Sequence, residues 1–247
     1  MKLRICTYNI HKGFSQFNRH MKIHELRDCL RQLDPDVVFL QEVQGLHMGH
    51  ARNHANWPSE PQHEFLADKR LAAAYGSNAA YDHGHHGNAV LSRFDILSAA
   101  NHDVTEHHLE RRGLLHCVIK MPQHAQSVHC ICVHLSLTKQ QRQRQFSTLI
   151  KFIKQRIPAN APIIIAGDFN DWNNHANTLL AQQLGLTEAF TSLTGNPARS
   201  FPSKLPVLRL DRIYVRGFAV AGGEVHCGKP WSSISDHAAL TAELHLS

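Results

Sequence analysis

The segment IIIAGDFNDW, residues Ile163–Trp172, joins a short apolar run to a dense group of polar side chains. A short apolar run that is bounded by a turn signal is consistent with a buried strand. The run stops at Gly167, and Asp168, Asn170 and Asp171 follow almost at once. We therefore predict a buried strand over 163–166 that delivers these three polar side chains to one spot at its carboxyl end.

Strand-like and helix-like segments alternate on both sides of this strand. Ile23, Leu26, Leu30 and Leu33 recur every three or four residues, which predicts one face of a helix. Two more helices are predicted near 140–155 and near 174–184, the second ending at Gly185. The predicted strands are KLRICTYNIH, VVFLQEV, AVLSRFDILSA, LLHCVIKM, SVHCICVHLSL, RLDRIYV and ALTAELHL.

Strands outnumber helices in this pattern, and several neighbouring strands lack a helix between them. This order argues against a regular parallel doubly wound fold and favours an α/β sandwich of two mixed sheets with helices outside. The chain shows no internal repeat, low-complexity tract or Pro/Gly/Ser-rich linker. We therefore expect residues 1–247 to form a single domain.

Composition limits the class of protein. The 247 residues are 43% hydrophobic, enough for a core, and no run of about 18 apolar residues predicts a membrane-spanning helix. The amino-terminal segment lacks the zones of a secretion signal, so a cytoplasmic protein is expected. The six cysteines are scattered and are interpreted as reduced thiols.

The formal net charge of +6 favours anionic partners such as nucleic acid, anionic lipid or phosphorylated metabolites. Six cations of the helix near 140–155 carry part of this charge, and most fan out opposite its apolar stripe. An ordinary solvated face is the preferred interpretation of this helix. The cations are Lys139, Arg142, Arg144, Lys151, Lys154 and Arg156.

Polar residues of catalytic type also follow or precede other predicted strands. A sheet fixes side chains more tightly than a loop, so active sites are often built at strand ends. One such Asp or His would be weak evidence, since each is more often a turn former or a bystander. The set is Asn9, Glu42, His134, Asp211 and the pair Asp236–His237.

The ordered motifs resemble the signature of the endonuclease/exonuclease/phosphatase superfamily with the deoxyribonuclease I-like fold. They span residues 7–240, and three longer segments (NIHKGFSQFNR, GHHGNAVLSR and LRLDRIYV) are similar to one bacterial group within it. The resemblance implies a four-layer α/β/β/α sandwich with the site where the two sheets open. The motifs are TYNIH, LQEV, GNAVLSR, VHLSL, AGDFND, LDRIYV and SDHAAL.

The resemblance also implies a cofactor. Glu42 resembles the main carboxylate ligand of a Mg²⁺ or Mn²⁺ ion, and Asn9 and Asp236 lie close by as direct or water-mediated ligands. Oxygen ligands of this kind suit a hard divalent cation.

Catalytic roles follow residue by residue from the same resemblance. Asp168 resembles the residue that orients and deprotonates the attacking water, and Asn170 its neighbour that holds the phosphate. His237 resembles the histidine that binds the phosphoryl oxygen, with Asp211 fixing its ring, and His134 is a second phosphate-facing histidine. A positioned water, a base and positive charge are what phosphate ester hydrolysis needs. The alternative in which His237 is the base remains open.

Other segments bear on the substrate. The DHGHH stretch, residues 82–86, resembles a zinc cluster, but its tight spacing and the family pattern favour an approach to GNAVLSR, in which Asn88 contacts substrate. Trp172 is expected to pack under its loop. A histidine in VHL stands where abasic-site endonucleases have an Asn-containing loop, which disfavours abasic cleavage. No separate lipid-binding hairpin or exposed aromatic run is visible, which counts against a membrane substrate.

Three functions compete. The first is a metal-dependent phosphodiesterase acting on nucleic acid or a nucleotide-like ester. The second is a phospholipid or phosphoinositide esterase with the same residues at a membrane surface, and the third is a catalytically silent phosphate-binding module. No protein partner is inferred, and the complete residue set disfavours the silent module.

Overall fold

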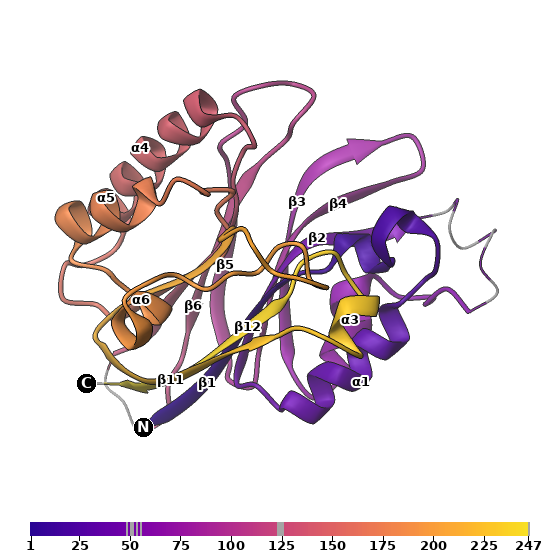
Figure 1. The fold of residues 1–247 in the computed structure, drawn as a ribbon, viewed down its shortest axis with the longest axis horizontal. Helices are drawn as coiled ribbons and strands as arrows, with labels where there is room; N and C mark the ends of the chain where they lie inside the picture. Colours follow the sequence, from indigo (N-terminus) through magenta and orange to yellow (C-terminus); the bar gives the residue numbers. More distant parts are fainter. Residues whose placement is uncertain (48, 50–51, 53, 55, 123–125, 247) are drawn as a thin grey trace.

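The computed structural model describes residues 1–247 apart from 48, 50, 51, 53, 55, 123–125 and 247. Its described strands form two sheets that pack face to face (Figure 1). The first sheet has the order β11-β12-β1-β2-β4-β3. Its strands are β1 (Lys2–Asn9), β2 (Val37–His47), β3 (Ala72–Tyr81), β4 (Gly84–Ser92), β11 (Phe218–His226) and β12 (Ala239–Leu246).

The second sheet has the order β5-β6-β7-β8-β10-β9. Each sheet is mixed, because β1 runs parallel to β2 and β7 runs parallel to β8, whereas the other pairs are antiparallel. Its strands are β5 (Ile96–Asp103), β6 (Gly113–Ile119), β7 (Val128–His134), β8 (Ile163–Asp168), β9 (Thr187–Glu188) and β10 (Asp211–Arg216).

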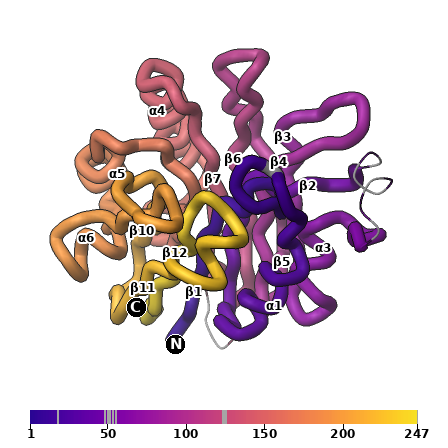
Figure 2. Tube along the Cα trace, turned by 45° about the vertical axis from the view of Figure 1, so that its right-hand side comes forward, coloured from indigo at the N-terminus to yellow at the C-terminus, as the bar shows by residue number. Residues whose placement is uncertain are grey.

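Helices cover the outer faces of both sheets. In Figures 1 and 2, α4 and α5 lie against the second sheet, and α1 and α3 lie against the first. None of the described helices is both long enough and apolar enough to cross a membrane. The helices are α1 (Ile23–Leu33), α3 (Gln62–Ala67), α4 (Lys139–Arg156), α5 (His175–Leu184) and α6 (Ala189–Thr194), with 3₁₀ turns η1 (His11–Gly13), η2 (Gln16–Asn18) and η3 (Trp231–Ser233).

Strand β8 shows how the sequence produces these layers. Successive side chains of a strand point to opposite faces, so Ile163 and Ile165 join the cluster under α4 and α5, while Ile164 and Ala166 join the core between the sheets. Both faces of β8 are therefore buried, which explains its uninterrupted apolar run. At Gly167 an added Cβ would lie 1.9 Å from the carbonyl oxygen of Val133, so the backbones approach too closely for a side chain.

The predicted α/β/β/α sandwich is confirmed, and so are the three predicted helices. The apolar stripe of α4 packs inward as expected. Arg142 differs from the solvated-face expectation, because it is buried. Its guanidinium donates to the carbonyl oxygens of Ser136 and Leu137 at 2.9 and 2.8 Å. These bonds replace water and anchor the turn that follows β7.

One edge of the sandwich collects the strand ends that carry polar residues. Strands β1, β7 and β8 finish there at Asn9, His134 and Asp168, and the antiparallel strand β10 begins there at Asp211. In Figure 1 this edge includes the β3–β4 hairpin and the β5–β6 connection at the top, and both termini lie at the bottom. We call it the site edge.

Candidate active site

Asp168 is the centre of the polar cluster at the site edge. As the last residue of β8 it is buried, and its Oδ1 accepts a hydrogen bond from the backbone N–H of Asn170 at 2.9 Å. Its Oδ2 accepts a bond from Nδ2 of Asn9 at 3.2 Å. The same oxygen lies 3.5 Å from Nε2 of His134 and 3.7 Å from Nε2 of His237. Four predicted site residues from two strands and two loops thus surround one carboxylate.

The imidazole of His237 lies between two buried carboxylates. Its Nδ1 donates to Oδ2 of Asp211 at 2.9 Å, which directs Nε2 toward Asp168. Asp211 is fully buried at the start of β10 and pairs with Asp168 across the sheet. The adjacent strands therefore hold the two carboxylates side by side.

The pKa values of this pair follow from burial and charge. Burial disfavours the imidazolium of His237, but the negative charges of Asp211 and Asp168 and the bond to Asp211 raise its pKa to about 10. Burial raises the pKa of Asp168 to about 6, against the attraction of His237 and with the repulsion of Asp211. At pH 7 the arrangement holds a protonated imidazole beside an ionised Asp168.

The pKa of His134 is shifted in the opposite direction to that of His237. Burial, followed by the positive charges of Arg112, His237, His86 and Lys12, lowers its pKa well below the ordinary range. The imidazole is therefore neutral near pH 7. Of the one or two imidazoliums that the sequence suggested, the structure holds one, at His237.

Lys12, His86 and Arg112 were not singled out as site residues by the sequence. Arg112 precedes β6, donates through Nε to the carbonyl oxygen of Leu135 at 3.3 Å and pairs with Glu110 at 2.9 Å. A signal was present, because an arginine pair stands directly before a predicted strand that starts at the same edge.

The turn after β8 fixes the other two polar residues of the opening segment. Asn170 adopts a left-handed backbone with φ 49°, and its Nδ2 donates to the carbonyl oxygen of Leu135 at 2.9 Å. One of its two amide hydrogens remains for another acceptor. Asp171 instead accepts from the backbone N–H of Ala176 at 2.7 Å and so holds the first turn of α5.

The three predicted metal-binding residues lie on adjoining segments. Asn9 pairs with Gln41, the neighbour of Glu42, and the Ser235 hydroxyl donates to the carbonyl oxygen of Asn9 at 2.7 Å, next to Asp236. Glu42 lies at a bulge in β2 with φ 57°. A β-bulge re-aims a side chain out of the alternating pattern.

The donor set fits a hard divalent cation, since Glu42, Asn9 and Asp236 each offer oxygen. Among the described residues a second group, Asp168, Asp211 and His237, also lies close enough to hold an ion. That group fits a metal less well, because His237 is protonated and already bonded to Asp211. The oxygen set is therefore the better candidate for Mg²⁺ or Mn²⁺.

Asn88 is buried in β4 between the sheets. Its Nδ2 donates to the carbonyl oxygens of Gly113 at 2.9 Å and Cys132 at 3.4 Å, which ties the first sheet to the second. Its Oδ1 has no hydrogen-bond partner among the described residues. The predicted contact between Asn88 and substrate remains a prediction, and the amide has a structural role beside it.

The structure places two further segments that the sequence singled out. Residues 82–86 form the β3–β4 turn and the start of β4, and the expectation that they do not bind zinc stays a prediction. Trp172 does not pack under its loop, because 44% of it is exposed. Its ring instead lies over the buried guanidinium of Arg142 at 4.9 Å.

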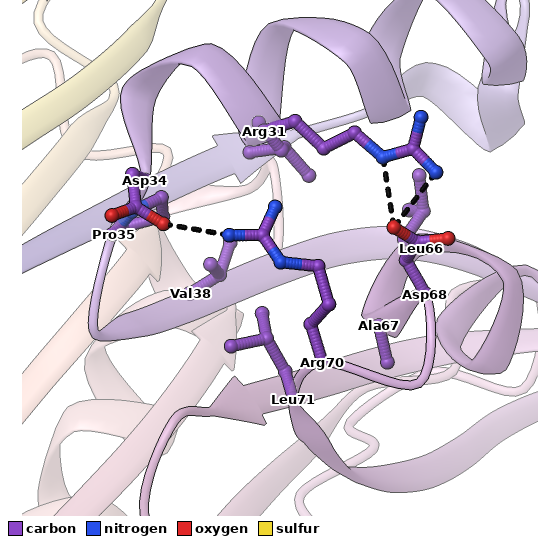
Figure 3. A pocket seen from close by; sticks show the side chains of 10 residues that line it. Arg31, Asp34, Pro35, Val38, Leu66, Ala67, Asp68, Arg70 and Leu71 are labelled. Carbon is purple, nitrogen blue, oxygen red and sulfur yellow. Dashed lines mark hydrogen bonds and ion pairs between the residues drawn. The ribbon is translucent and has the colours of Figure 1, made fainter.

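A separate small pocket lies at the opposite end of β2, between the ends of α1 and α3 (Figure 3). Its volume of about 20 Å³ leaves room for about one water molecule. The surrounding charges are paired, Arg31 with Asp68 at 2.7 Å and Arg70 with Asp34 at 3.0 Å. These ion pairs hold the helix ends in place, and the pocket lacks space for a substrate.

Comparison with known proteins agrees with this geometry. The profile of the Endonuclease/Exonuclease/phosphatase family matches residues 6–237. The chain belongs to that family. Family members are hydrolases that act on phosphate esters. The protein YbhP of Escherichia coli strain K12 is 46% identical over 244 residues, which cover 98% of this chain and 96% of YbhP. The bacterial group suggested by the sequence is thereby confirmed.

Solved structures of the family share the fold at low identity. An endonuclease/exonuclease/phosphatase from Beutenbergia cavernae has a TM-score of 0.77 and 20% identity, with 100% of this chain and 72% of that chain covered. One from Bacteroides vulgatus has a TM-score of 0.77 and 17% identity, with both chains fully covered. D. rerio TDP2 complexed with single strand DNA product has a TM-score of 0.72 and 19% identity, with 99% of each chain covered.

Proposed function

We propose that this chain is a divalent-metal-dependent phosphodiesterase that hydrolyses a P–O bond by in-line attack of a water molecule. The observation that carries the proposal is the buried arrangement of Asp168, His237 and Asp211. It supports the proposal because a carboxylate with a pKa of about 6 lies next to an imidazole with a pKa of about 10, so that at pH 7 the first is ionised and the second is protonated. These are the two charges that hydrolysis of a phosphate ester needs at one point.

Each residue has a definite part in this reaction. Asp168 accepts a proton from water as the water oxygen bonds to phosphorus, and the ester P–O bond breaks so that the alcohol leaves as its alkoxide, which takes up a proton from solvent water. The Nε2–H of His237 donates to a phosphoryl oxygen, and Asp211 keeps the ring charged and oriented. The free amide hydrogen of Asn170 donates to a second phosphoryl oxygen.

The neutral His134 completes the polar surroundings of Asp168. A divalent ion held by Glu42, Asn9 and Asp236 would supply Lewis-acid stabilisation of the charge that develops on the phosphoryl group.

The alternative in which His237 is the base is less well supported. A group with a pKa of about 10 carries its proton at neutral pH and cannot accept another. Asp168 has a free lone pair at the same pH, and its own pKa of about 6 lies near the value that suits a general base.

The substrate is proposed at the level of a phosphodiester. The net charge of +6 supports a nucleic acid or a nucleotide-like ester, and so does the shared fold with D. rerio TDP2, which was solved with single strand DNA product. Binding of this kind would weaken steeply with salt. A phospholipid is the second candidate, and exposed apolar side chains around the site edge favour it.

The test uses purified protein, Mg²⁺ or Mn²⁺, and the soluble ester bis(p-nitrophenyl) phosphate. We expect Asp168→Asn to lower kcat by a factor of about 10² to 10⁴, the usual worth of a general base. Asp95→Asn, a change of the same kind on the surface, is the control. Removal of the metal with a chelator should abolish turnover, and added Mg²⁺ should restore it.

Full activity of Asp168→Asn would contradict the assignment of the base. Turnover that persists in the chelator would contradict the metal requirement. Circular dichroism of the variant checks that the fold is intact.

A further inference from the structure

Exposed apolar side chains gather around the site edge. The described residues include twelve large apolar side chains that are exposed, and three of them, Met1, Leu97 and Leu193, lie elsewhere. The other nine belong to segments that enter or leave strands at the site edge. We call these nine the apolar rim: Phe17, Leu46, Tyr81, Leu109, Leu137, Trp172, Leu205, Val207 and Leu208.

The strand topology explains why these residues share one edge. Phe17 follows β1, Leu137 follows β7 and Trp172 follows β8, all at their carboxyl ends. Leu109 lies in the β5–β6 connection and Tyr81 ends β3 at the β3–β4 hairpin, both of which project at the top in Figure 1. The same ends deliver Asn9, His134 and Asp168, so the rim and the candidate active site lie at the same edge of the sandwich.

The most apolar part of the rim is the turn between Phe201 and Leu208, which pair across an isolated bridge. Leu205 at its tip is 73% exposed. The base of the turn contacts the site, because the ring of Phe201 lies 5.0 Å from that of His237. The backbone N–H of Ser203 also donates to the carbonyl oxygen of Asp236 at 2.7 Å. An exposed apolar tip is thus fixed directly beside the proposed phosphate-binding histidine.

Cations accompany three segments of the apolar rim, whereas Asp82, Glu106 and Glu110 lie on the segments that carry Tyr81 and Leu109. The segments 10–22, 135–142 and 195–210 together contain eight Lys or Arg residues and no Asp or Glu. Of these, Arg19, Lys139, Arg199 and Lys204 are exposed. A surface with exposed apolar groups between exposed cations matches the boundary of an anionic bilayer, where apolar groups enter the acyl region and cations meet the headgroups.

The composition of the rim distinguishes between two anionic partners, single-stranded nucleic acid and a phospholipid bilayer. Single-stranded nucleic acid is bound by aromatic rings that stack on bases. The rim has three aromatic members, Phe17, Tyr81 and Trp172, and the other six are Leu or Val. Aliphatic groups gain little from stacking but gain free energy by leaving water for hydrocarbon. The rim therefore favours lipid over nucleic acid.

We infer that the apolar rim binds the surface of an anionic phospholipid bilayer and that the substrate of the site is a phospholipid headgroup ester. This inference rests on the proposed function, because the hydrolysis is the one described above with a lipid as the phosphodiester. It departs from the sequence-based expectation, which found no lipid-binding hairpin. The turn 201–208 provides one, and its apolar residues are too few to be noticed in the sequence.

The binding test uses Asp168→Asn protein, so that no turnover alters the lipid. We expect it to sediment with vesicles of phosphatidylcholine and phosphatidylglycerol, and far less with phosphatidylcholine alone. Adding Leu205→Ser and Val207→Ser should raise the vesicle dissociation constant at least about tenfold, since two apolar groups no longer enter the bilayer. Adding Leu97→Ser and Leu193→Ser, outside the rim, should leave it unchanged.

The turnover test compares vesicles with soluble bis(p-nitrophenyl) phosphate in the protein with Asp168 intact. We expect the ratio of vesicle to soluble turnover to fall about tenfold or more in Leu205→Ser/Val207→Ser. Turnover of the soluble ester without any vesicle binding would overturn the inference and leave the proposed function standing. Vesicle binding without turnover of either ester would support the rim and overturn the proposed function.

Binding that prefers single-stranded DNA and ignores vesicles would also overturn the inference. So would equal loss of vesicle binding in the rim variant and in the Leu97→Ser/Leu193→Ser control.

Discussion

A single imidazole between two buried carboxylates sets the charge of the candidate site. Asp211 bonds to Nδ1 of His237, and Asp168 faces Nε2 from the neighbouring strand. Neither carboxylate reaches water freely, so their charges act on the ring with little screening. One pair of adjacent strands therefore produces an acid and a base whose pKa values lie on opposite sides of neutrality.

The pH dependence of turnover follows from this pair. Asp168 works as the carboxylate, so kcat/KM should rise with pH through about 6, and His237 works as the imidazolium, so kcat/KM should fall near pH 10. Asp211→Asn removes a charge that raises the pKa of His237, so the alkaline limb should move toward neutral pH. The pH–rate profile on the soluble ester measures both limbs.

A profile that rises only at high pH, through about 10, would indicate that His237 is the base and would contradict this account. An alkaline limb that stays in place in Asp211→Asn would show that the carboxylate does not set the charge of the ring.

Sequence reasoning could name most of these residues, because each stands at the end of an apolar run. It could not find their electrostatic partners. Lys12, His86 and Arg112 act on His134 across connections between strands, and that proximity exists only after the sheets pack. It also could not assign the neutral state of His134, which depends on complete burial.

At the scale of elements, the bulge in β2 gives Glu42 a strained backbone near the site edge. Its φ of 57° is a left-handed conformation that β-carbon sterics disfavour in residues other than glycine. Backbone strain of this kind is often retained where function requires it. The strain at Glu42 therefore accords with the metal-binding role proposed for its carboxylate.

Replacement of Glu42 by glycine should relieve the backbone strain at this position. We expect Glu42→Gly to raise the free energy of unfolding by about 0.5 to 1 kcal/mol, the relief of strain less the added freedom of the unfolded chain. Turnover with Mg²⁺ should be lost, since the proposed ligand is gone. Urea unfolding gives the first quantity and the soluble-ester assay the second.

Glu224→Gly in β11 is the control, because Glu224 has no left-handed backbone. That change should lower the free energy of unfolding by about 0.5 to 1 kcal/mol. Equal destabilisation by both substitutions would contradict stored strain at Glu42.

A helix or strand could be predicted from the sequence where one local pattern determined its structure. Helix α1 was predicted at its observed bounds, because its apolar residues follow a strict helical period. Strand β3 was missed, since its sequence AAAYGSNAAY is small and mostly solvated and carries no alternating pattern. The turn 201–208 was also missed, because its shape depends on the pairing of Phe201 with Leu208 and on Asp236, far along the chain.

At the scale of the whole molecule, half-buried histidines with lowered pKa values link stability to pH. Burial lowers the pKa of His63 and of His116 to about 4. In the unfolded chain these groups titrate near 6.5, so between pH 6.5 and 4 the unfolded state binds more protons. Above pH 6.5 these histidines are neutral in both the folded and the unfolded state, so they do not affect the free energy of unfolding. Below pH 6.5 the free energy of unfolding falls as the pH drops.

The measurement is urea unfolding at pH 7 and pH 5. We expect the free energy of unfolding to be lower at pH 5 than at pH 7. In His63→Gln the decrease in the free energy of unfolding from pH 7 to pH 5 should be smaller, since one titrating group is removed. His20→Gln, at an exposed histidine, should retain the wild-type difference. A pH-independent free energy of unfolding would contradict this account.

The pairing of β1 with both β2 and β12 limits when the first sheet can be completed during synthesis. Strand β1 is synthesised before β12, yet the two strands pair from Lys2↔His245 to Thr7↔Leu240, so β1 remains without one of its two neighbours while the intervening strands are made. Until then the nascent chain carries an open strand edge. The candidate site is also completed late, because Asp236 and His237 lie just before β12, and a chain that terminates before these residues would lack both of them and would be prone to aggregate through the open edge.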